Sequence, residues 1–296
     1  MGSIALDDVE TPKAKVKGAL GGSNTFISIA ASYFTKPIYM VGVVGEDFPE
    51  EHLNLFKKYD IDLEGLQIIP GGKTFRWGRV YLENFIDRDT TFTDLNVFEN
   101  FNPIIPESKR ESKIVLLGNI DPVLQLNVLE QINNPDLVIC DTMNLWINIR
   151  NNELKEVIKK IDVLIINDSE AKMLANENNV IRAAKMVMDM GPKYLIIKKG
   201  EHGAMLFGED KIFSAPAYPI EELHDPTGAG DTFAGGFAGY LLKSGDISFA
   251  NMKKAVVYGS TMASFSVEQF STGGIENLTN EKIEKRYKTF KELSEF

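Results

Sequence analysis

The sequence contains little cysteine, histidine or tryptophan and no long apolar run. Its 296 residues include 1 Cys, 3 His and 2 Trp. The lone Cys140 cannot form an internal disulfide, and its apolar neighbours predict a buried, inert thiol in a reducing cytosol. The histidines lack the spacing of zinc ligands, which argues against a zinc site. No stretch approaches the ~20 apolar residues of a transmembrane helix, and the first residues do not resemble a signal peptide.

Basic residues are outnumbered by acidic ones. The chain has 32 Lys and Arg against 42 Asp and Glu, which gives a formal net charge of −10. Because such a surface repels phosphate backbones and anionic lipids, we expect neither nucleic acid nor a membrane as a partner. Hydrophobic residues make up 44% of the chain, enough to bury a sizeable core without disulfides or metals. The composition predicts an acidic, globular, cytoplasmic protein.

Short β-branched runs alternate with stretches whose apolar residues recur every three or four positions. This alternation is typical of a parallel sheet covered by helices on both faces, so the predicted fold class is α/β. The expected strands are 38–44, 113–117, 137–141, 163–167, 194–198 and 204–207. The expected helices are 122–132, 152–160, 169–175, 180–190, 232–243 and 251–267, with a charged, solvated helix at 281–296.

Residues 73–98 break this alternation. They are rich in aromatic and β-branched residues that alternate with polar ones, which predicts antiparallel strands exposed on one side, with Asp87-Arg88-Asp89 at a turn. Together with residues 13–20, these strands are expected to form a small sheet outside the main one. Such an appendage can act as a lid, as a dimer interface, or as both.

The strongest local signal is the segment 225–231, DPTGAGD, which is followed by small residues at helical spacing. A Gly228-Ala229-Gly230 turn that opens a helix directs backbone N–H groups outward at the positive end of the helix dipole, where they bind anions. Asp231 in the first turn can then take a proton from a hydroxyl that attacks phosphorus. Alternatively, Asp231 is only a helix N-cap. Spacing alone does not separate these two roles.

Two more segments follow predicted strands. Asn167 and Glu170 are expected at the sheet edge where α/β proteins place ligands. They fit either a site for Mg²⁺ and phosphate or a capping arrangement around Asp168 or Ser169. Residues 198–203, KKGEHG, join two apolar strands, and a tight glycine turn explains them without a ligand.

Two glycine motifs fail as nucleotide fingerprints. Segment 72–74, GKT, lacks the glycine five positions earlier that a P-loop requires, and a strand pattern follows it. Gly228 and Gly230 are followed by Phe233, where a dinucleotide-binding motif needs its third glycine. A nucleotide-binding oxidoreductase is therefore disfavoured. The absence of a Gly-x-Ser-x-Gly motif argues against a hydrolase.

Taken together and in this order, these segments resemble the ribokinase/PfkB-type carbohydrate kinase family. Segment 225–233 is similar to the second signature of that family, and segments 21–24 and 41–48 are similar to the first. The motifs at 167–170 and 199–203 stand where the family keeps its nucleotide and magnesium elements. The resemblance covers nearly the whole chain.

The resemblance implies a ribokinase-like three-layer sandwich with a central, mostly parallel sheet and a small β-sheet lid. Residues 1–296 would form one kinase domain, with lid insertions at about 13–20 and 73–98. The implied activity is ATP-dependent phosphorylation of an alcohol with Mg²⁺ as cofactor. A homodimer formed through the β lid is a further expectation.

The same resemblance assigns roles to individual residues. The implied catalytic residues are the base Asp231 and the anion-hole residues Gly228, Ala229 and Gly230. The implied nucleotide-site residues are Asn167, Glu170, Lys198, Gly200, Gly203, Thr227 and Ser260, with Glu170 also organising Mg²⁺ through water. The implied substrate-site residues are Asp7, Gly21, Gly22, Phe26 and Asn119. Asp225, with Thr227, overlaps a monovalent-cation site of some members, which makes K⁺ a further candidate cofactor.

Phe26 departs from the family pattern. Many sugar kinases carry Asn five places after the first glycine of the substrate-side pair, and an aromatic ring cannot accept a hydrogen bond from a sugar hydroxyl. Phe26 is therefore expected either to join an apolar wall against a nucleobase or cyclitol, or to pack the lid against the core. The other aromatic residues considered for this wall are Phe75, Trp77 and Phe92. The first strand is also expected to be shortened at its start.

The predicted function is a kinase that phosphorylates a hydroxyl of a small, polyhydroxylated sugar or sugar-like substrate. One alternative is a nucleoside kinase (adenosine- or cytidine-like) or a myo-inositol kinase of the same family. Another is a non-catalytic ligand-binding protein with this fold. The intact Asp231 and glycine turn argue against the loss of turnover.

Overall fold

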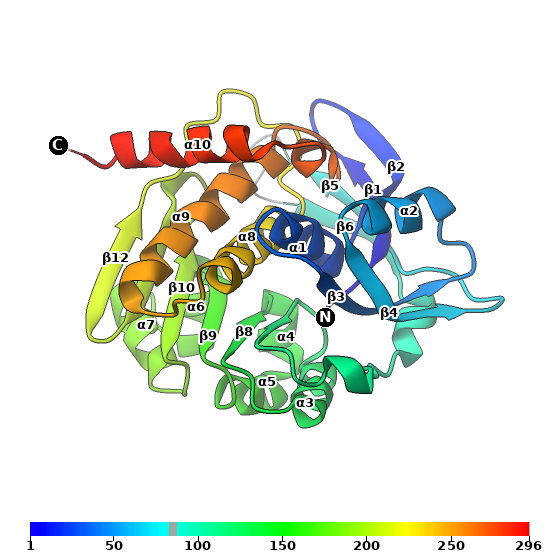
Figure 1. The fold of residues 1–296 in the computed structure, drawn as a ribbon, viewed down its shortest axis with the longest axis horizontal. Helices are drawn as coiled ribbons and strands as arrows, with labels where there is room; N and C mark the ends of the chain where they lie inside the picture. The colour runs from blue at the N-terminus through cyan, green and yellow to red at the C-terminus, as the bar shows by residue number, and fades with distance from the viewer. Residues whose placement is uncertain (83–87, 296) are drawn as a thin grey trace.

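A computed structural model describes residues 1–82 and 88–295, and Figure 1 shows the arrangement of the elements. The strands in these ranges are β1 (Ala5–Glu10), β2 (Lys15–Gly21), β3 (Ile38–Gly45), β4 (Ile61–Ile69), β5 (Arg76–Tyr81), β6 (Arg88–Asp94), β7 (Ile114–Leu117), β8 (Leu137–Asp141), β9 (Val163–Asn167), β10 (Tyr194–Lys198), β11 (Ala204–Gly208) and β12 (Lys211–Ala215). The α-helices are α1 (Ser23–Ser32), α2 (Glu50–Lys58), α3 (Pro122–Gln131), α4 (Asn144–Ile149), α5 (Asn151–Ile158), α6 (Asp168–Ala175), α7 (Val180–Met188), α8 (Ala229–Ser244), α9 (Phe249–Ser266) and α10 (Asn280–Glu292).

The largest sheet has the strand order β12-β11-β10-β9-β8-β7. Strands β7 to β10 are parallel, and β11 and β12 add to them as antiparallel strands. Successive strand residues point to opposite faces, so Val138 and Cys140 enter the core on one face and Ile139 enters the core on the other. Helices α3, α5, α6 and α7 cover the first face, and α8 and α9 cover the second. The predicted three-layer α/β architecture is therefore confirmed.

A separate sheet has the order β2-β1-β5-β6, and it lies on the opposite side of the molecule from β12 (Figure 1). Residues 13–20 and 73–98 were expected to form a small sheet, but β1 was not expected to belong to it. Strand β1 belongs to it because β1 pairs with β2 on one edge and with β5 on the other. Of the predicted turn, Asp87 lies outside the described residues. Arg88 and Asp89 were wrongly placed in that turn, since both belong to β6.

The first residues of the chain run along β7 before β1 begins. The Met1 ammonium donates to the carbonyl of Leu116, and the Gly118 N–H donates to the carbonyl of Met1. Burial lowers the pKa of this amine to about 5. Strand β1 then starts at Ala5 and joins the small sheet rather than the six-stranded one.

Three features of the helices differ from the sequence expectations. Helix α1 was not predicted because all ten of its residues are buried, so it has no amphipathic pattern to detect. Helix α10 is charged but not wholly solvated, since Ile283 and Phe290 are buried. Short helices α2 and α4 were also missed.

Within the described residues, no helix is both long enough and apolar enough to cross a bilayer.

Candidate active site

Polar side chains gather where the parallel strands of the six-stranded sheet end. Asp141 is the last residue of β8, Asn167 of β9 and Lys198 of β10. Because these strands are parallel and adjacent, their carboxyl ends meet at one edge of the sheet. That edge is where open α/β sheets place their ligands.

The turn that precedes α8 has a backbone conformation that requires glycine. Gly228 is the N-cap of α8 and has a φ of 72°. A Cβ at this position would also lie 2.5 Å from the ring of Phe26, which packs directly beneath the turn. The carbonyl of Gly228 accepts the N–H of Thr232 at 2.7 Å and so begins the helix. The sequence therefore fixes a turn whose following amides lie at the positive end of a 16-residue helix.

Asp231 lies in the first turn of α8. The N-cap of this helix is Gly228, without a side-chain cap, so the alternative that Asp231 is the N-cap is wrong. The carboxylate lies close enough to the Lys198 ammonium for its charge to raise the pKa of that lysine. The role of Asp231 as a base stays a prediction, but the competing explanation that Asp231 is only a helix N-cap no longer applies.

Lys198 brings a cation, which is only partly exposed, to the glycine turn. Its Nζ lies 3.2 Å from Oδ1 of Asp141, and a Cβ placed on Gly230 would lie 2.8 Å from the same Nζ. Burial by itself lowers the pKa of Lys198, but the charges of Asp141, Glu170 and Asp231 outweigh it and the net pKa is raised. The ammonium therefore stays charged beside the turn. Asp141 was expected only as the end of an apolar strand, and its place beside Lys198 was not predicted.

Asn167 and Glu170 form a capping box at the start of α6. Oδ1 of Asn167 accepts the N–H of Glu170 at 2.8 Å, and Oε2 of Glu170 accepts the N–H of Asn167 at 2.8 Å. The capping alternative was right in kind but wrong in place, since the N-cap is Asn167 rather than Asp168 or Ser169. The Glu170 carboxylate is buried and near Lys198, so the capping role places it beside the other charged groups, and its role toward Mg²⁺ or phosphate stays a prediction.

The segment after β10 is a tight glycine turn, as predicted. The N–H of Gly203 donates to the carbonyl of Gly200 at 3.1 Å, and these glycines have φ values of 87° and 55°. A side chain on Gly203 would overlap the backbone at Ala215. A nucleotide contact here stays a prediction. So does one at Ser260, which is half-buried in α9.

Asp7 and Arg79 form a buried ion pair between β1 and β5 of the small sheet. Burial raises the pKa of Asp7 to about 6, the Arg79 charge and hydrogen bond oppose this rise, and Asp225 and Asp8 add to it. Among the described residues, Oδ1 of Asp7 and Nε of Arg79 have no hydrogen-bond partner. The pair thus has an acceptor and a donor to offer to a ligand hydroxyl.

The glycine pair beside Asp7 leaves space for its carboxylate. A Cβ on Gly21 would overlap that carboxylate, and Gly22, the N-cap of α1, has a φ of 88°. The predicted substrate residues Asp7, Gly21 and Gly22 are therefore brought together in space, although their contact with a substrate stays a prediction.

Arg79 and the inward face of β5 were not predicted as part of the site. The guanidinium of Arg79 lies over the Trp77 ring at 4.0 Å, and Tyr81 and Thr227 hydroxyls are 3.1 Å apart. The last contact joins the small sheet to the segment that precedes α8. Alternation with a period of two from Trp77 through Arg79 to Tyr81 was the signal that could have found this face.

The four aromatic residues proposed as an apolar wall contact different partners. Phe26 is 1% exposed beneath Gly228. Phe75 stacks on Phe98 with ring centroids 5.3 Å apart. Trp77 holds the Arg79 guanidinium, and the Phe92 ring occupies the space that a Gly78 side chain would need. Packing therefore accounts for Phe26 and Phe75, and a shared apolar wall against a nucleobase or cyclitol stays a prediction.

Two other predicted residues have structural partners. Asn119 accepts a hydrogen bond from Nε1 of Trp146 at 2.9 Å, and its Nδ2 lies 3.0 Å from the Met143 sulfur. Asp225 is 1% exposed, and its Oδ1 accepts the N–H of Thr227 at 2.9 Å. A substrate contact at Asn119 and a K⁺ site at Asp225 stay predictions.

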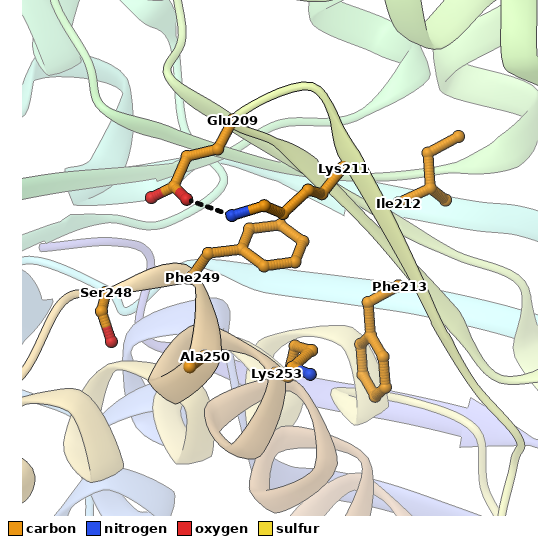
Figure 2. A pocket seen from close by; sticks show the side chains of 8 residues that line it. All are labelled: Glu209, Lys211, Ile212, Phe213, Ser248, Phe249, Ala250 and Lys253. Atoms are coloured by element: carbon orange, nitrogen blue, oxygen red, sulfur yellow. Dashed lines mark hydrogen bonds and ion pairs between the residues drawn. The ribbon is translucent and has the colours of Figure 1, made fainter.

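A hollow of about 620 Å³ lies elsewhere, between the β11–β12 hairpin and the start of α9 (Figure 2). Lys211 and Glu209 form an ion pair of 3.0 Å at its rim. Because the β10–β11 register pairs Phe207 with Leu195 at this end and Ala204 with Lys198 at the other, the hollow lies at the opposite edge of the sheet. It therefore shares no residue with the group around Lys198.

Comparisons with known proteins agree with this arrangement. Residues 5–278 match the family described as "pfkB family carbohydrate kinase". A cytidine kinase of Thermococcus kodakarensis is 29% identical over 247 residues, which are 81% of this chain and 87% of that protein. A nucleoside kinase of Methanocaldococcus jannaschii has a similar structure, with a TM-score of 0.76 and 21% identity over 97% of this chain and 96% of that one.

A putative ribokinase II from E. coli, solved in complex with ATP and Mg²⁺, has a TM-score of 0.80 and 17% identity over 97% of both chains. These structural likenesses establish the ribokinase-like fold. The family match spans most of the chain and includes the glycine turn and Asp231. The chain therefore belongs to the pfkB family of carbohydrate kinases, and it is a phosphotransferase whose acceptor is an alcohol.

Proposed function

We propose that this protein uses ATP and Mg²⁺ to phosphorylate a hydroxyl of a nucleoside, with Asp231 as the base. The observation that carries this proposal is the position of Asp231 in the first turn of α8, directly after the Gly228 turn and near the Lys198 ammonium. The relative named a cytidine kinase and the structural neighbour named a nucleoside kinase support a nucleoside acceptor. A free sugar is the second candidate, since the relatives also include a ribokinase of Bacillus subtilis, 25% identical over 306 residues.

In the proposed reaction, Asp231 accepts the proton of the attacking hydroxyl as the new O–P bond forms. The amides that follow Gly228 would stabilise the negative charge that develops on the transferred group. Asp7 would accept hydrogen bonds from neighbouring substrate hydroxyls, and the free Nε of Arg79 would donate one. The Tyr81–Thr227 contact joins the small sheet to the segment before α8, so the small sheet would cover the site and exclude water.

The residues present fit a magnesium ion. Glu170 presents a carboxylate at the sheet edge, and Mg²⁺ prefers oxygen ligands and keeps several waters. Oδ1 of Asn167 already accepts the Glu170 N–H and the Ser169 hydroxyl, so Asn167 would support Glu170 rather than hold the ion itself. Glu170 would hold the ion through water. When bound, Mg²⁺ would neutralise phosphate charge.

Glu170→Gln separates the capping role of this residue from its proposed metal role. Gln at the third position of a helix still accepts the N-cap N–H, so we expect α6 and the melting temperature to be preserved. The loss of the carboxylate charge should raise the Mg²⁺ concentration that gives half-maximal activity about tenfold. Mg²⁺ titrations of turnover measure this change, and Glu170→Ala, which loses both roles, is the comparison. An unchanged Mg²⁺ requirement in Glu170→Gln would leave Glu170 with a capping role only.

The function is tested by ADP release from Mg-ATP across nucleosides, pentoses, hexoses, keto-deoxy acids and inositols. We expect the highest kcat/KM with a nucleoside and no activity in Asp231→Asn. A preference for a free pentose or hexose would favour the second candidate. If ATP binds and no acceptor yields ADP above the Asp231→Asn background, the chain is a binding protein with a kinase fold.

The remaining expectations are also proposals. We infer that residues 1–296 form one kinase domain in which the β2-β1-β5-β6 sheet is the lid. The single buried Cys140 and the use of ATP support a cytoplasmic location. A K⁺ ion near Asp225 and a homodimer through the lid are testable by cation dependence and by light scattering.

A further inference from the structure

The Lys198–Asp141 pair is placed at the point where a phosphoryl group would meet the base. Lys198 Nζ lies against the backbone of Gly230, as shown by the 2.8 Å separation from a Cβ built there. The charge of Asp231 acts on the same ammonium. A cation at this position therefore lies beside both the glycine turn and the carboxylate that the proposed reaction uses.

The carboxylates around Lys198 would repel an anionic phosphoryl group, and the positive charge of Lys198 can offset this repulsion. Asp141, Glu170 and Asp231 all place negative charge near its ammonium. An incoming phosphoryl group is also anionic, and like charges repel strongly where little water screens them. The side chains of Lys198 and Asp141 are only 18% and 7% exposed, so screening here is weak. A fixed cation beside both the base and the phosphoryl group lowers this repulsion.

Asp141 is held firmly enough to position Lys198. Gln125, which is 0% exposed, donates from Nε2 to the carbonyls of Gly118 and Asp141 at 3.0 and 3.1 Å. These bonds tie together the ends of β7 and β8. The Asp141 carboxylate then meets Lys198 across β9, the strand that lies between β8 and β10.

We propose that Lys198 contacts the transferred phosphoryl group at the Gly228–Gly230 turn, and that Asp141 is a positioning residue that holds the ammonium there. This inference rests on the proposed phosphoryl transfer from ATP. It differs from a general role in nucleotide binding, because the contact is with the terminal phosphoryl group. Lys198 should therefore distinguish ATP from ADP.

The test measures dissociation constants for ADP and for the non-hydrolysable imido analogue of ATP, both with Mg²⁺, by calorimetry. Lys198→Met leaves the Asp141 carboxylate buried and unpaired, so the double variant Lys198→Met/Asp141→Asn is included to keep the site neutral and folded. We expect the ratio of the ADP constant to the analogue constant to fall about tenfold in the double variant. Its kcat should fall about 30-fold, the range for loss of a hydrogen bond to a charged group.

Asp141→Asn alone tests the positioning role. Lys198 is retained in this variant, so the preference for the ATP analogue should weaken by only about threefold and kcat by about fivefold. Lys198→Arg, which keeps the charge, should recover part of the preference. A fall in thermal stability without a change in this ratio would make Asp141 a purely structural residue and overturn its part of the proposal.

The chain offers a matched control at the other end of β10. Lys193 and Asp162 form an ion pair of 2.8 Å, and the Lys193 side chain is 74% exposed. Lys193→Met/Asp162→Asn should leave both the nucleotide ratio and kcat within about twofold.

Two outcomes would be decisive against the proposal for Lys198. The first is that a folded Lys198→Met/Asp141→Asn variant keeps the parental ratio of the dissociation constants for ADP and the ATP analogue. The second is that this folded variant keeps kcat within threefold of the parent. If the parent phosphorylates no alcohol, the proposed function fails. The nucleotide ratio still reports on Lys198 in that case, so the two failures are distinguishable.

Discussion

Asp231→Asn should lower kcat about 10³-fold while leaving the affinity for Mg-ATP within about threefold. Asn has the same shape as Asp and fits the first turn of α8, so the glycine turn and Lys198 stay in place. Asn cannot accept the proton of the attacking hydroxyl. The loss should therefore fall on the chemical step, and rapid-quench measurement of product in the first turnover checks it.

A control keeps this result from being confused with a loss of helix stability. A carboxylate in the first turn of a helix stabilises that helix by about 0.3–1 kcal/mol, so the melting temperature should fall only slightly. Asp246→Asn removes an exposed carboxylate that precedes α9 and accepts the Ser248 N–H at 2.8 Å. It should keep full turnover. If Asp231→Asn retains more than a tenth of parental kcat, Asp231 is not the base.

Arg79→Met should lower kcat/KM at pH 7 about 100-fold, mainly through KM for the acceptor. Arg79 is the charge partner of the buried Asp7, so its removal leaves the carboxylate without a countercharge. Since Arg79 lowers the pKa of Asp7 against the effect of burial, the pKa should rise further in the variant. A protonated Asp7 no longer accepts two substrate hydroxyls, and the Arg79 donor is also lost.

The pH dependence of kcat/KM shows whether the loss of activity in Arg79→Met comes from protonation of Asp7. Burial raises the pKa of Asp7 to about 6, and the ionised form is the better acceptor, so parental kcat/KM should fall as the pH drops below about 6. In Arg79→Met this acid limb should move to higher pH. Raising the pH from 7 to 9 should therefore restore activity in the variant but change the parent little. Asp225 and Asp8, the other carboxylates that act on Asp7, are unchanged in both proteins.

Arg76→Met is the matched control because it lies on the same strand and pairs with the neighbouring carboxylate. Its Nη2 lies 3.0 Å from Oδ1 of Asp8, and the two side chains are 40% and 20% exposed. Partial exposure makes this pair weaker, so kcat/KM should stay within about threefold. Arg79→Lys, which retains the charge, should recover about tenfold over Arg79→Met. An Arg79→Met profile with an unshifted acid limb would show that Asp7 does not control acceptor binding.

Much of the six-stranded sheet could be predicted because its pattern is local. Strands 137–141, 163–167 and 194–198 have the predicted bounds, since each is a continuous apolar run between polar segments. Helix α1 could not be predicted by the same method, because burial on every side removes the polar face that marks a helix. A first strand was expected, but its place in the small sheet was missed, because the pairing of β1 with β2 and β5 depends on segments outside its own sequence.

The candidate site divides in the same way. The DPTGAGD segment indicated the turn before α8 from seven consecutive residues, because glycine adopts the positive φ of Gly228 more readily than any other residue. Asn167 and Glu170 were likewise recognised as a pair at helical spacing. Asp141 carried no such local signal, and for Arg79 the only local signal was the period-two alternation from Trp77 to Tyr81. Each is a charged residue next to apolar or aromatic neighbours, a pattern that also describes many surface positions.

The sequence by itself determined the turn at Gly228, the placement of Asp231 in the first turn of a helix, the α/β alternation and membership of the kinase family. Tertiary structure alone decided which charges meet. Asp7 and Arg79 are 72 positions apart and Asp141 and Lys198 are 57 apart. The backbone conformation of a turn depends mainly on the residues in it, and so it can be predicted from a short stretch of sequence. Burial and charge pairing depend on strand order. Strand order places Asp7 and Arg79 on the neighbouring strands β1 and β5, and it brings Asp141 and Lys198 to one edge of the six-stranded sheet.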